Sequence, residues 1–206
     1  MSRPRFDRLP AEKREMILES AAREFAAHGF ENASMNKILE DAQLSKGAAY
    51  YYFDDKADLF ATTVQHYAGD LIGGLEDSLG DLRAENFWAT FADLYAAQFD
   101  FFYDRPWAFG AIKAAGKLSP SELEKHPALT ASLGTIMEGL ASVLQHGQQL
   151  GVVRTDLPED LLSALFVGVD DASDRWILAH WETMNKEALL DIARRIIDAL
   201  RRMVAP

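Results

Sequence analysis

Apolar residues recur along most of the chain at the three- and four-residue spacing of an α-helix. The first such stripe, within residues 10–28, consists of Ile17, Leu18, Ala21, Ala22 and Phe25. No convincing run of the sequence alternates apolar and polar residues, and no hairpin turn of the Asn-Gly type occurs. The pattern therefore predicts an all-α fold.

About nine helices are predicted from this periodicity. Their ranges are 10–28, 35–41, 46–51, 56–79, 85–103, 106–116, 122–150, 158–181 and 186–203. Glycine and proline mark several helix boundaries. Gly29 directly follows the first helix, and Pro158 stands at the start of the eighth. Residues 119–127 are predicted to form a loop with room for one helical turn.

Two of the predicted helices are short, lie close together and each follow a serine. Ser34 precedes residues 35–41, and Ser45 precedes the next helix after about three intervening residues. A serine hydroxyl can accept a hydrogen bond from a free backbone N–H at a helix start. Helices this short are marginal alone, so the longer helices on either side would have to support them. The arrangement is the outline of a helix-turn-helix.

Charge and composition narrow the class of protein. The 206 residues include 21 Lys and Arg against 32 Asp and Glu, a net charge of −11. Residues 1–66 hold 9 basic and 11 acidic residues, whereas residues 67–206 hold 12 and 21, so the first third can present a local basic face. The sequence has no cysteine, which suits a cytoplasmic protein, and no apolar run approaches the length of a membrane span.

The stretch ILESAAREFAAHGFENASMNKILEDAQLSKGAAYYYFDDKADLF, with a few residues before it, resembles the DNA-binding domain of TetR-type bacterial transcriptional repressors. The matching residues, in order and spacing, are Phe25, Gly29, Phe30, Ser34, Ile38, Ala42, Leu44, Ser45, Lys46, Gly47, Tyr50, Tyr51, Phe53, Lys56, Leu59 and Phe60. Ala49, Tyr52 and the Met35-Asn36-Lys37 segment depart from residues common in the family. The resemblance implies a three-helix DNA-binding domain followed by a larger helical domain that binds a ligand and dimerises.

The second short helix suits contact with a polyanion, because it begins with small residues and a lysine and continues with phenol donors. The resemblance implies that Lys46, Gly47 and Tyr50 meet bases or nearby backbone. The full set of predicted DNA-binding residues is Ser34, Lys37, Ser45, Lys46, Gly47, Ala48, Tyr50, Tyr51, Tyr52 and Lys56. Packing inside the domain is an equal alternative for Tyr52. Arg3, Arg5 and Arg8 could form an arm that reaches the minor groove, but a disordered tail is the favoured alternative.

Aromatic residues crowd positions 87–109 on more than one helical face. Such residues usually form core, but their excess, in a family built around ligand cavities, indicates a pocket for an apolar or aromatic effector. The predicted ligand-binding residues are Trp88, Phe91, Tyr95, Phe99, Trp107, Met137, Phe166, Asp170 and Trp176. Asp170 or Asp174 could meet a cationic effector in an aromatic cage. A solvated edge, or an ion pair with Arg175 or a partner subunit, is the favoured alternative.

The last two predicted helices offer apolar residues to a second subunit, as four-helix interfaces do. These residues are Leu161, Leu165, Ala172, Ile177, Leu189, Ile192, Ile196 and Leu200. A homodimer would match a near-palindromic operator in double-stranded DNA. The five histidines lack metal-ligand spacing, and no constellation of catalytic residues stands out, so no metal, cofactor or enzymatic activity is predicted.

These inferences predict a bacterial, cytoplasmic, homodimeric transcriptional regulator, a repressor released from its operator by a small molecule. Its predicted domains are residues 1–56, which bind DNA, and residues 57–206, which bind the ligand and dimerise. The helix at 56–79 is the expected lever between them, made compliant by Gly69, Gly73 and Gly74. Two alternatives stay open: a helical small-molecule-binding protein without specific DNA binding, and a helical enzyme using the aromatic pocket.

Overall fold

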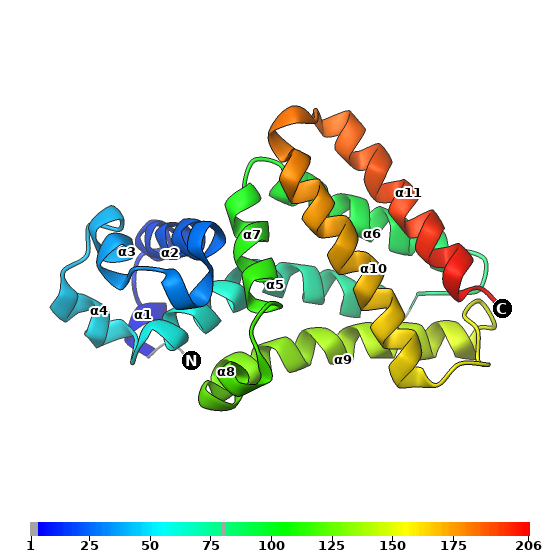
Figure 1. Cartoon of the computed structure of the whole chain (residues 1–206), viewed down its shortest axis with the longest axis horizontal. Coiled ribbons are helices and arrows are strands. Elements are labelled where there is room, and N and C mark those ends of the chain that lie inside the picture. Colours follow the sequence, from blue (N-terminus) through cyan, green and yellow to red (C-terminus); the bar gives the residue numbers. More distant parts are fainter. Residues whose placement is uncertain (1–3, 80) are drawn as a thin grey trace. The chain divides into compact units, whose positions relative to one another are not determined.

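The computed structural model describes the backbone of residues 4–79 and 81–206, and the side chains of that range except those of residues 70–79, 128, 132, 135 and 136. The described part of the chain is helical throughout its regular structure (Figure 1), which confirms the all-α prediction. The helices are α1 (Pro4–Asp7), α2 (Ala11–Asn32), α3 (Met35–Asp41), α4 (Lys46–Tyr52), α5 (Lys56–Leu79), α6 (Phe87–Phe102), α7 (Pro106–Ala115), α8 (Pro120–Lys125), α9 (Pro127–Gln149), α10 (Glu159–His180) and α11 (Lys186–Val204), with the 3-10 helix η1 (Trp181–Thr183) after α10. None of the described helices is both long and apolar enough to cross a membrane.

One short α-helix, α1, was not among the predicted nine and precedes the first of them. The helix predicted at 122–150 is divided at His126 into α8 and α9, and α8 is the helical turn allowed within residues 119–127. The start of α8 is a capping box in which Ser119 and Glu122 satisfy each other's backbone N–H groups. At the end of α2, Gly29 adopts a positive φ of 69° and kinks the helix, which then continues to Asn32.

The chain forms two compact units, one of residues 1–70 and 107–135 and the other of residues 71–106 and 136–206. Helices α5 and α9 contribute residues to both units. The predicted functional division at residue 56 stays a prediction. In the first unit, the core gathers around a phenylalanine cluster: the ring centroids of Phe25 and Phe60 are 4.4 Å apart, and those of Phe30 and Phe60 are 5.3 Å apart.

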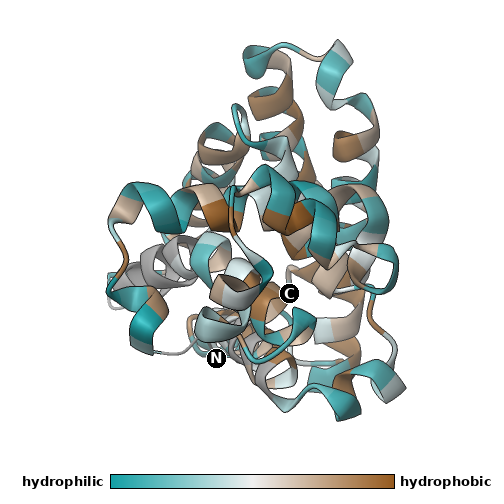
Figure 2. Ribbon diagram, turned by 90° about the vertical axis from the view of Figure 1, so that its left-hand side faces the viewer, coloured by the Kyte–Doolittle hydropathy of each residue, from teal (hydrophilic) through white to brown (hydrophobic). Residues whose placement is uncertain are grey.

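In the second unit, α11 packs along α6 and α10. Hydrophobic and hydrophilic residues are mixed along the helical ribbons (Figure 2), as expected for helices that bury one face. The buried residues of α11 are Leu189, Ala193, Ile197, Leu200 and Val204. This corrects one expectation: Leu189 and Leu200, with Ile177 of α10, are at most 1% exposed within their own chain and are not open to a second subunit.

Helix α1 is docked beneath α4 through the side chain of Phe6. The Phe6 ring is 3% exposed, and its centroid lies 4.9 Å from that of Phe53 and 6.3 Å from that of Tyr52. The guanidinium of Arg14 donates to the carbonyl oxygen of Asp7 at 2.6 Å and holds the end of α1 on α2. The N-terminal segment from Pro4 onward is therefore ordered rather than a tail, and the half-buried Tyr52 ring favours the packing alternative for that residue.

We expect Phe6→Ala to lower the free energy of unfolding by about 3 kcal/mol, the low end for a buried Phe→Ala change, because a short terminal helix can relax. Urea denaturation followed by circular dichroism measures this value. The control is Arg5→Ala, which alters an exposed neighbour in the same helix. A loss under about 1 kcal/mol for Phe6→Ala would show that α1 does not support α4.

Candidate functional site

Helices α3 and α4 form the helix-turn-helix that the sequence predicts, and local hydrogen bonds fix both helix starts. The Ser34 hydroxyl accepts from the backbone N–H of Lys37 at 3.3 Å, and the Ser45 hydroxyl accepts from that of Ala48 at 3.2 Å. In the turn, Gln43 has a positive φ of 50°, which brings the chain back toward α4. Both predicted caps are therefore present.

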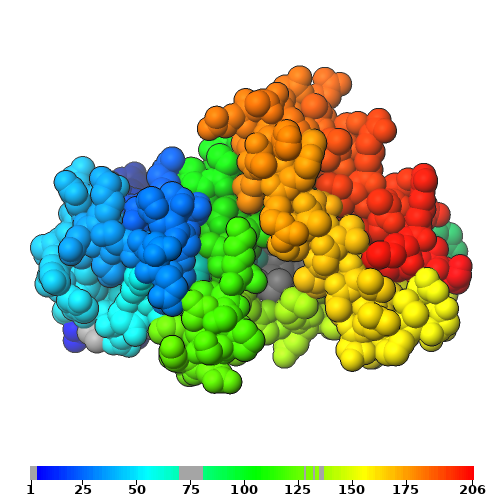
Figure 3. Space-filling view, in the orientation of Figure 1, coloured from blue at the N-terminus to red at the C-terminus, as the bar shows by residue number. Residues whose placement is uncertain are grey.

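The outer side of α4 is open to solvent, whereas its inner side is buried. Ala49 is 2% exposed, while the rings of Tyr50 and Tyr51 are 54% and 49% exposed. A Cβ placed on Gly47 would meet no other atom within 4 Å. The atoms of residues 34–52, light blue to cyan, are uncovered over part of the surface in Figure 3. A slim, uncovered helix of this kind can enter the major groove of DNA.

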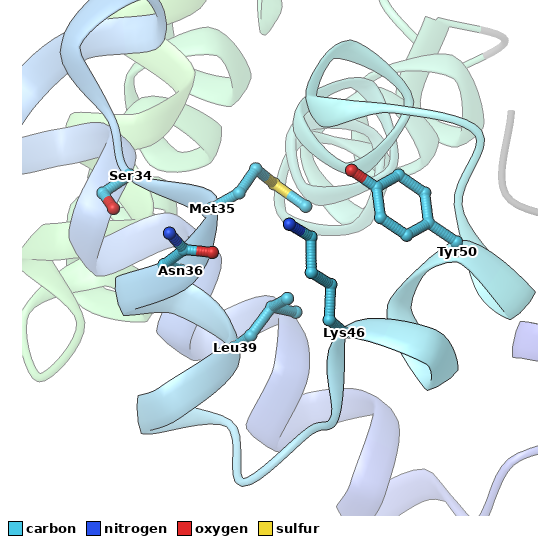
Figure 4. Close-up of a pocket in the computed structure, with 6 residues that line it drawn as sticks. All are labelled: Ser34, Met35, Asn36, Leu39, Lys46 and Tyr50. Atoms are coloured by element: carbon cyan, nitrogen blue, oxygen red, sulfur yellow. The ribbon is translucent and has the colours of Figure 1, made fainter.

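A depression with a volume of about 180 Å³ lies between α3 and α4. Its lining consists of Ser34, Met35, Asn36 and Leu39 from α3, and Lys46 and Tyr50 from α4 (Figure 4). Met35, Asn36 and Leu39 are not in the predicted set of DNA-contacting residues. The sequence carried one sign of these residues: Met35 and Leu39 are four residues apart, which puts both on one side of a helix that begins beside α4.

Two of the predicted DNA-binding cations have partners inside the unit. The ammonium of Lys37 lies 2.6 Å from the Asp41 carboxylate, and this hydrogen bond and charge raise the pKa of Lys37. The ammonium of Lys56 donates to the carbonyl oxygens of Glu31 at 2.9 Å and Ala33 at 3.2 Å. Any contact with phosphate must compete with these interactions, and the role of each residue in DNA binding stays a prediction.

The aromatic residues of the second unit surround a phenol that joins α6 to α10. The Tyr95 hydroxyl donates to the carboxylates of Asp170 at 3.1 Å and Asp174 at 3.3 Å. Asp174 is only 2% exposed. Burial, and then the two nearby negative charges, raise the pKa of Tyr95 far above its usual range. The hydroxyl therefore keeps its proton and stays a donor throughout the neutral range.

Several residues of the predicted ligand-binding set lie together around this point. Ring centroids are 5.0 Å apart for Tyr95 and Phe99, 5.8 Å for Phe91 and Phe166, and 6.2 Å for Phe91 and Trp88. The prediction missed Trp181, which is 9% exposed with its centroid 6.3 Å from that of Phe99. It is the last residue of a predicted helix, where periodicity indicates no partner.

Other members of that set have different surroundings. Trp107 belongs to the first unit, where its ring meets the Tyr67 ring at 5.3 Å and lies under the Arg23 guanidinium. Met137 is 44% exposed, and Trp176 is 46% exposed with its ring stacked on an imidazole of the same helix. The predicted ligand-binding role of the whole set is untested, and the geometry supports it best for the residues near Tyr95.

We expect Tyr95→Phe to lower the free energy of unfolding by about 1–3 kcal/mol, because it removes the donor shared by two carboxylates, one of them fully buried. Urea denaturation measures the change. The matched control, Tyr103→Phe, removes a hydroxyl from a less buried ring of the same unit. Equal stability of Tyr95→Phe and the unmodified protein would contradict a structural role for the phenol.

Residues 17–63 match the family model described as bacterial regulatory proteins, tetR family. Over 190 residues, the chain is 24% identical to the HTH-type transcriptional repressor AcnR of Corynebacterium diphtheriae, and the alignment covers 90% of this chain and 91% of AcnR. The matched family region includes all of α3 and α4.

Solved structures share the fold along nearly the whole chain. FadR of Bacillus halodurans, a fatty acid degradation regulator, is similar with a TM-score of 0.74 and 18% identity, covering 91% of this chain and 97% of FadR. FadR of Bacillus subtilis, in complex with stearoyl-CoA, is similar with a TM-score of 0.72 and 18% identity, covering 90% of this chain and 96% of that one. At this identity the likeness concerns the fold.

Proposed function

We propose that this chain, whose residues 17–63 match the family model of tetR-type bacterial regulatory proteins, is a repressor that leaves its DNA operator when a small molecule binds. One observation carries the proposal: α4 exposes Lys46, Gly47 and Tyr50 on its outer side while its inner side is buried. The similarity to the repressor AcnR supports repression over activation.

On DNA, the proposed contacts divide by chemistry. Lys46 at the first turn of α4 donates to base edges, and Gly47 allows close approach of the backbone. Tyr51, with the guanidinium of Arg5 lying 4.3 Å from its ring centroid, is placed to bind phosphate. Tyrosine hydroxyls are neutral hydrogen-bond donors, so they can bind phosphate groups without adding positive charge to the domain. Such a protein acts in the cytoplasm, where bacterial operators are.

The proposed effector is apolar or aromatic, because aromatic rings predominate around Tyr95, whose hydroxyl is bonded to the carboxylates of Asp170 and Asp174. The effector would release DNA by binding more tightly to a state with altered spacing of the two recognition helices. Helix α5, which contains Gly69, Gly73 and Gly74, is the proposed lever between the domains. Long-chain acyl-CoA belongs in the first effector panel, since FadR of Bacillus subtilis was solved with stearoyl-CoA.

The proposed dimer forms through an exposed stripe of α10. Leu161, Leu165 and Trp176 are 45%, 38% and 46% exposed and lie on one helical face. Gly168 and Ala172 fall between them on that face, and both are exposed. Small residues at the centre of the stripe let two copies of α10 approach closely, and the larger side chains then pack on either side.

The first experiment is operator selection from random DNA, followed by a salt titration of binding by fluorescence anisotropy. We expect Lys46→Ala to lower affinity for the selected operator about 10- to 100-fold and to relax specificity at the contacted base pair, because Lys46 is the proposed base contact. Lys117→Ala, which removes the same charge from an exposed site outside α3 and α4, is the control. Absence of any enriched sequence would overturn the proposed function.

The second experiment measures the mass of the protein in solution. We expect the unmodified chain, of 23.0 kDa, to sediment as a dimer. Leu165→Asp should favour the monomer, because it places a charge in the centre of the apolar contact. Ser142→Asp adds the same charge at an exposed position of α9 and should remain dimeric. A dimeric Leu165→Asp variant would exclude α10 as the interface.

A further inference from the structure

We propose that the depression between α3 and α4 is a base-reading subsite that receives the methyl group of a thymine next to a purine. The proposal rests on the DNA binding proposed above, and it assigns part of the sequence specificity to α3. In the sequence-based prediction, α3 and its cap contributed only Ser34 and Lys37 to the DNA-binding set.

The lining of the depression is divided between apolar and polar groups. Met35 and Leu39, one turn apart on α3, supply the apolar part, and Leu39 is 7% exposed. In Figure 4, the thioether end of Met35, the Lys46 ammonium and the Tyr50 hydroxyl point toward a common space, with the Asn36 amide beside them. An apolar wall thus faces hydrogen-bonding groups across a short distance.

This division matches the edges that bases present in the major groove. The thymine C5-methyl group is the apolar group on those edges, and it packs against apolar side chains. Lysine donates to O6 and N7 of guanine, and asparagine pairs with N6 and N7 of adenine. A thymine beside a purine would therefore satisfy the wall of Met35 and the donors of Lys46 and Asn36 together.

The size of the depression agrees with a base edge rather than a whole ligand. Its volume of about 180 Å³ is below the roughly 300–1,000 Å³ of small-molecule pockets. It exceeds the ~30 Å³ share of one water molecule, which is close to the size of a methyl group, so a methyl group fits inside. The remaining space can hold ordered water between the polar side chains and the neighbouring base, as specific protein–DNA interfaces commonly do. The opening lies beside the exposed side chains of Lys46 and Tyr50.

A thymine-to-uracil scan of the selected operator tests the proposal on the unmodified protein. Deoxyuridine keeps every hydrogen-bonding group of thymine and lacks only the methyl group. At one thymine in each half-site, we expect the replacement to weaken binding by about three- to tenfold, the effect of withdrawing one buried methyl group. Replacements elsewhere should change affinity less than twofold.

Variants of Met35 then connect the effect to the depression. Met35→Ala should bind the thymine and uracil operators within about twofold of each other, whereas Met35→Leu should keep the preference for thymine. Met16→Ala, which shortens an exposed methionine of α2, is the matched control and should keep it as well. Thermal unfolding of each variant confirms that it is folded.

The outcomes separate this inference from the proposed function. Selection of a specific operator in which no thymine is sensitive to uracil, or sensitivity that persists in folded Met35→Ala, would overturn the subsite and leave DNA binding intact. Failure to select any operator would overturn the proposed function itself. If Met35→Ala did not fold, the scan on the unmodified protein and the folded Met35→Leu variant would still decide the question.

Discussion

The burial of the inner side of α4 is the constraint on which the rest depends. A helix of seven residues is too short to persist in water by its own hydrogen bonds. Here the side chains of Ala49 and Phe53, both at most 2% exposed, pack into the core. Phe6 of α1 packs against the Phe53 ring and adds to this support. Because packing holds its inner side, α4 remains helical although its outer side exposes a glycine and tyrosine rings to solvent.

This arrangement also answers how an acidic protein can approach a polyanion. Lys37 and Lys56 already have acceptors within the unit, and the whole chain carries a net charge of −11. Neutral phenol donors avoid the cost of desolvating and balancing more cations on a short helix. At Tyr51 a phenol and a cation lie together. The exposed ring of Tyr51 lies beneath the guanidinium of Arg5, which belongs to α1 near the start of the chain.

Local signals explain which parts could be predicted. The bounds of α3 were predicted as 35–41, as observed, because Ser34 marks the start and the turn marks the end. By contrast, α1 is held by tertiary contacts of Phe6. The hydrophobic periodicity of a four-residue segment cannot reveal such contacts. The apolar faces of α10 and α11 were recognised, but periodicity does not say what covers a face. Ile177 and Leu189 are therefore in the chain's own core, where the sequence suggested a partner.

The two faces of α10 suggest why a ligand and a dimer contact can share one helix. One face bears the exposed stripe of Leu161, Leu165 and Trp176, and the other is tied to α6 through Asp170 and Asp174. A shift of the Tyr95 hydroxyl changes what holds the inner face, and a helix transmits such a shift along its length as a rigid body. A small molecule that competes for those two carboxylates, or that wedges between Tyr95 and Phe99, would alter the position of α10 within its unit. The exposed stripe would move with it, so under the proposed function occupancy near Tyr95 would change the geometry of the proposed dimer contact through a single helix.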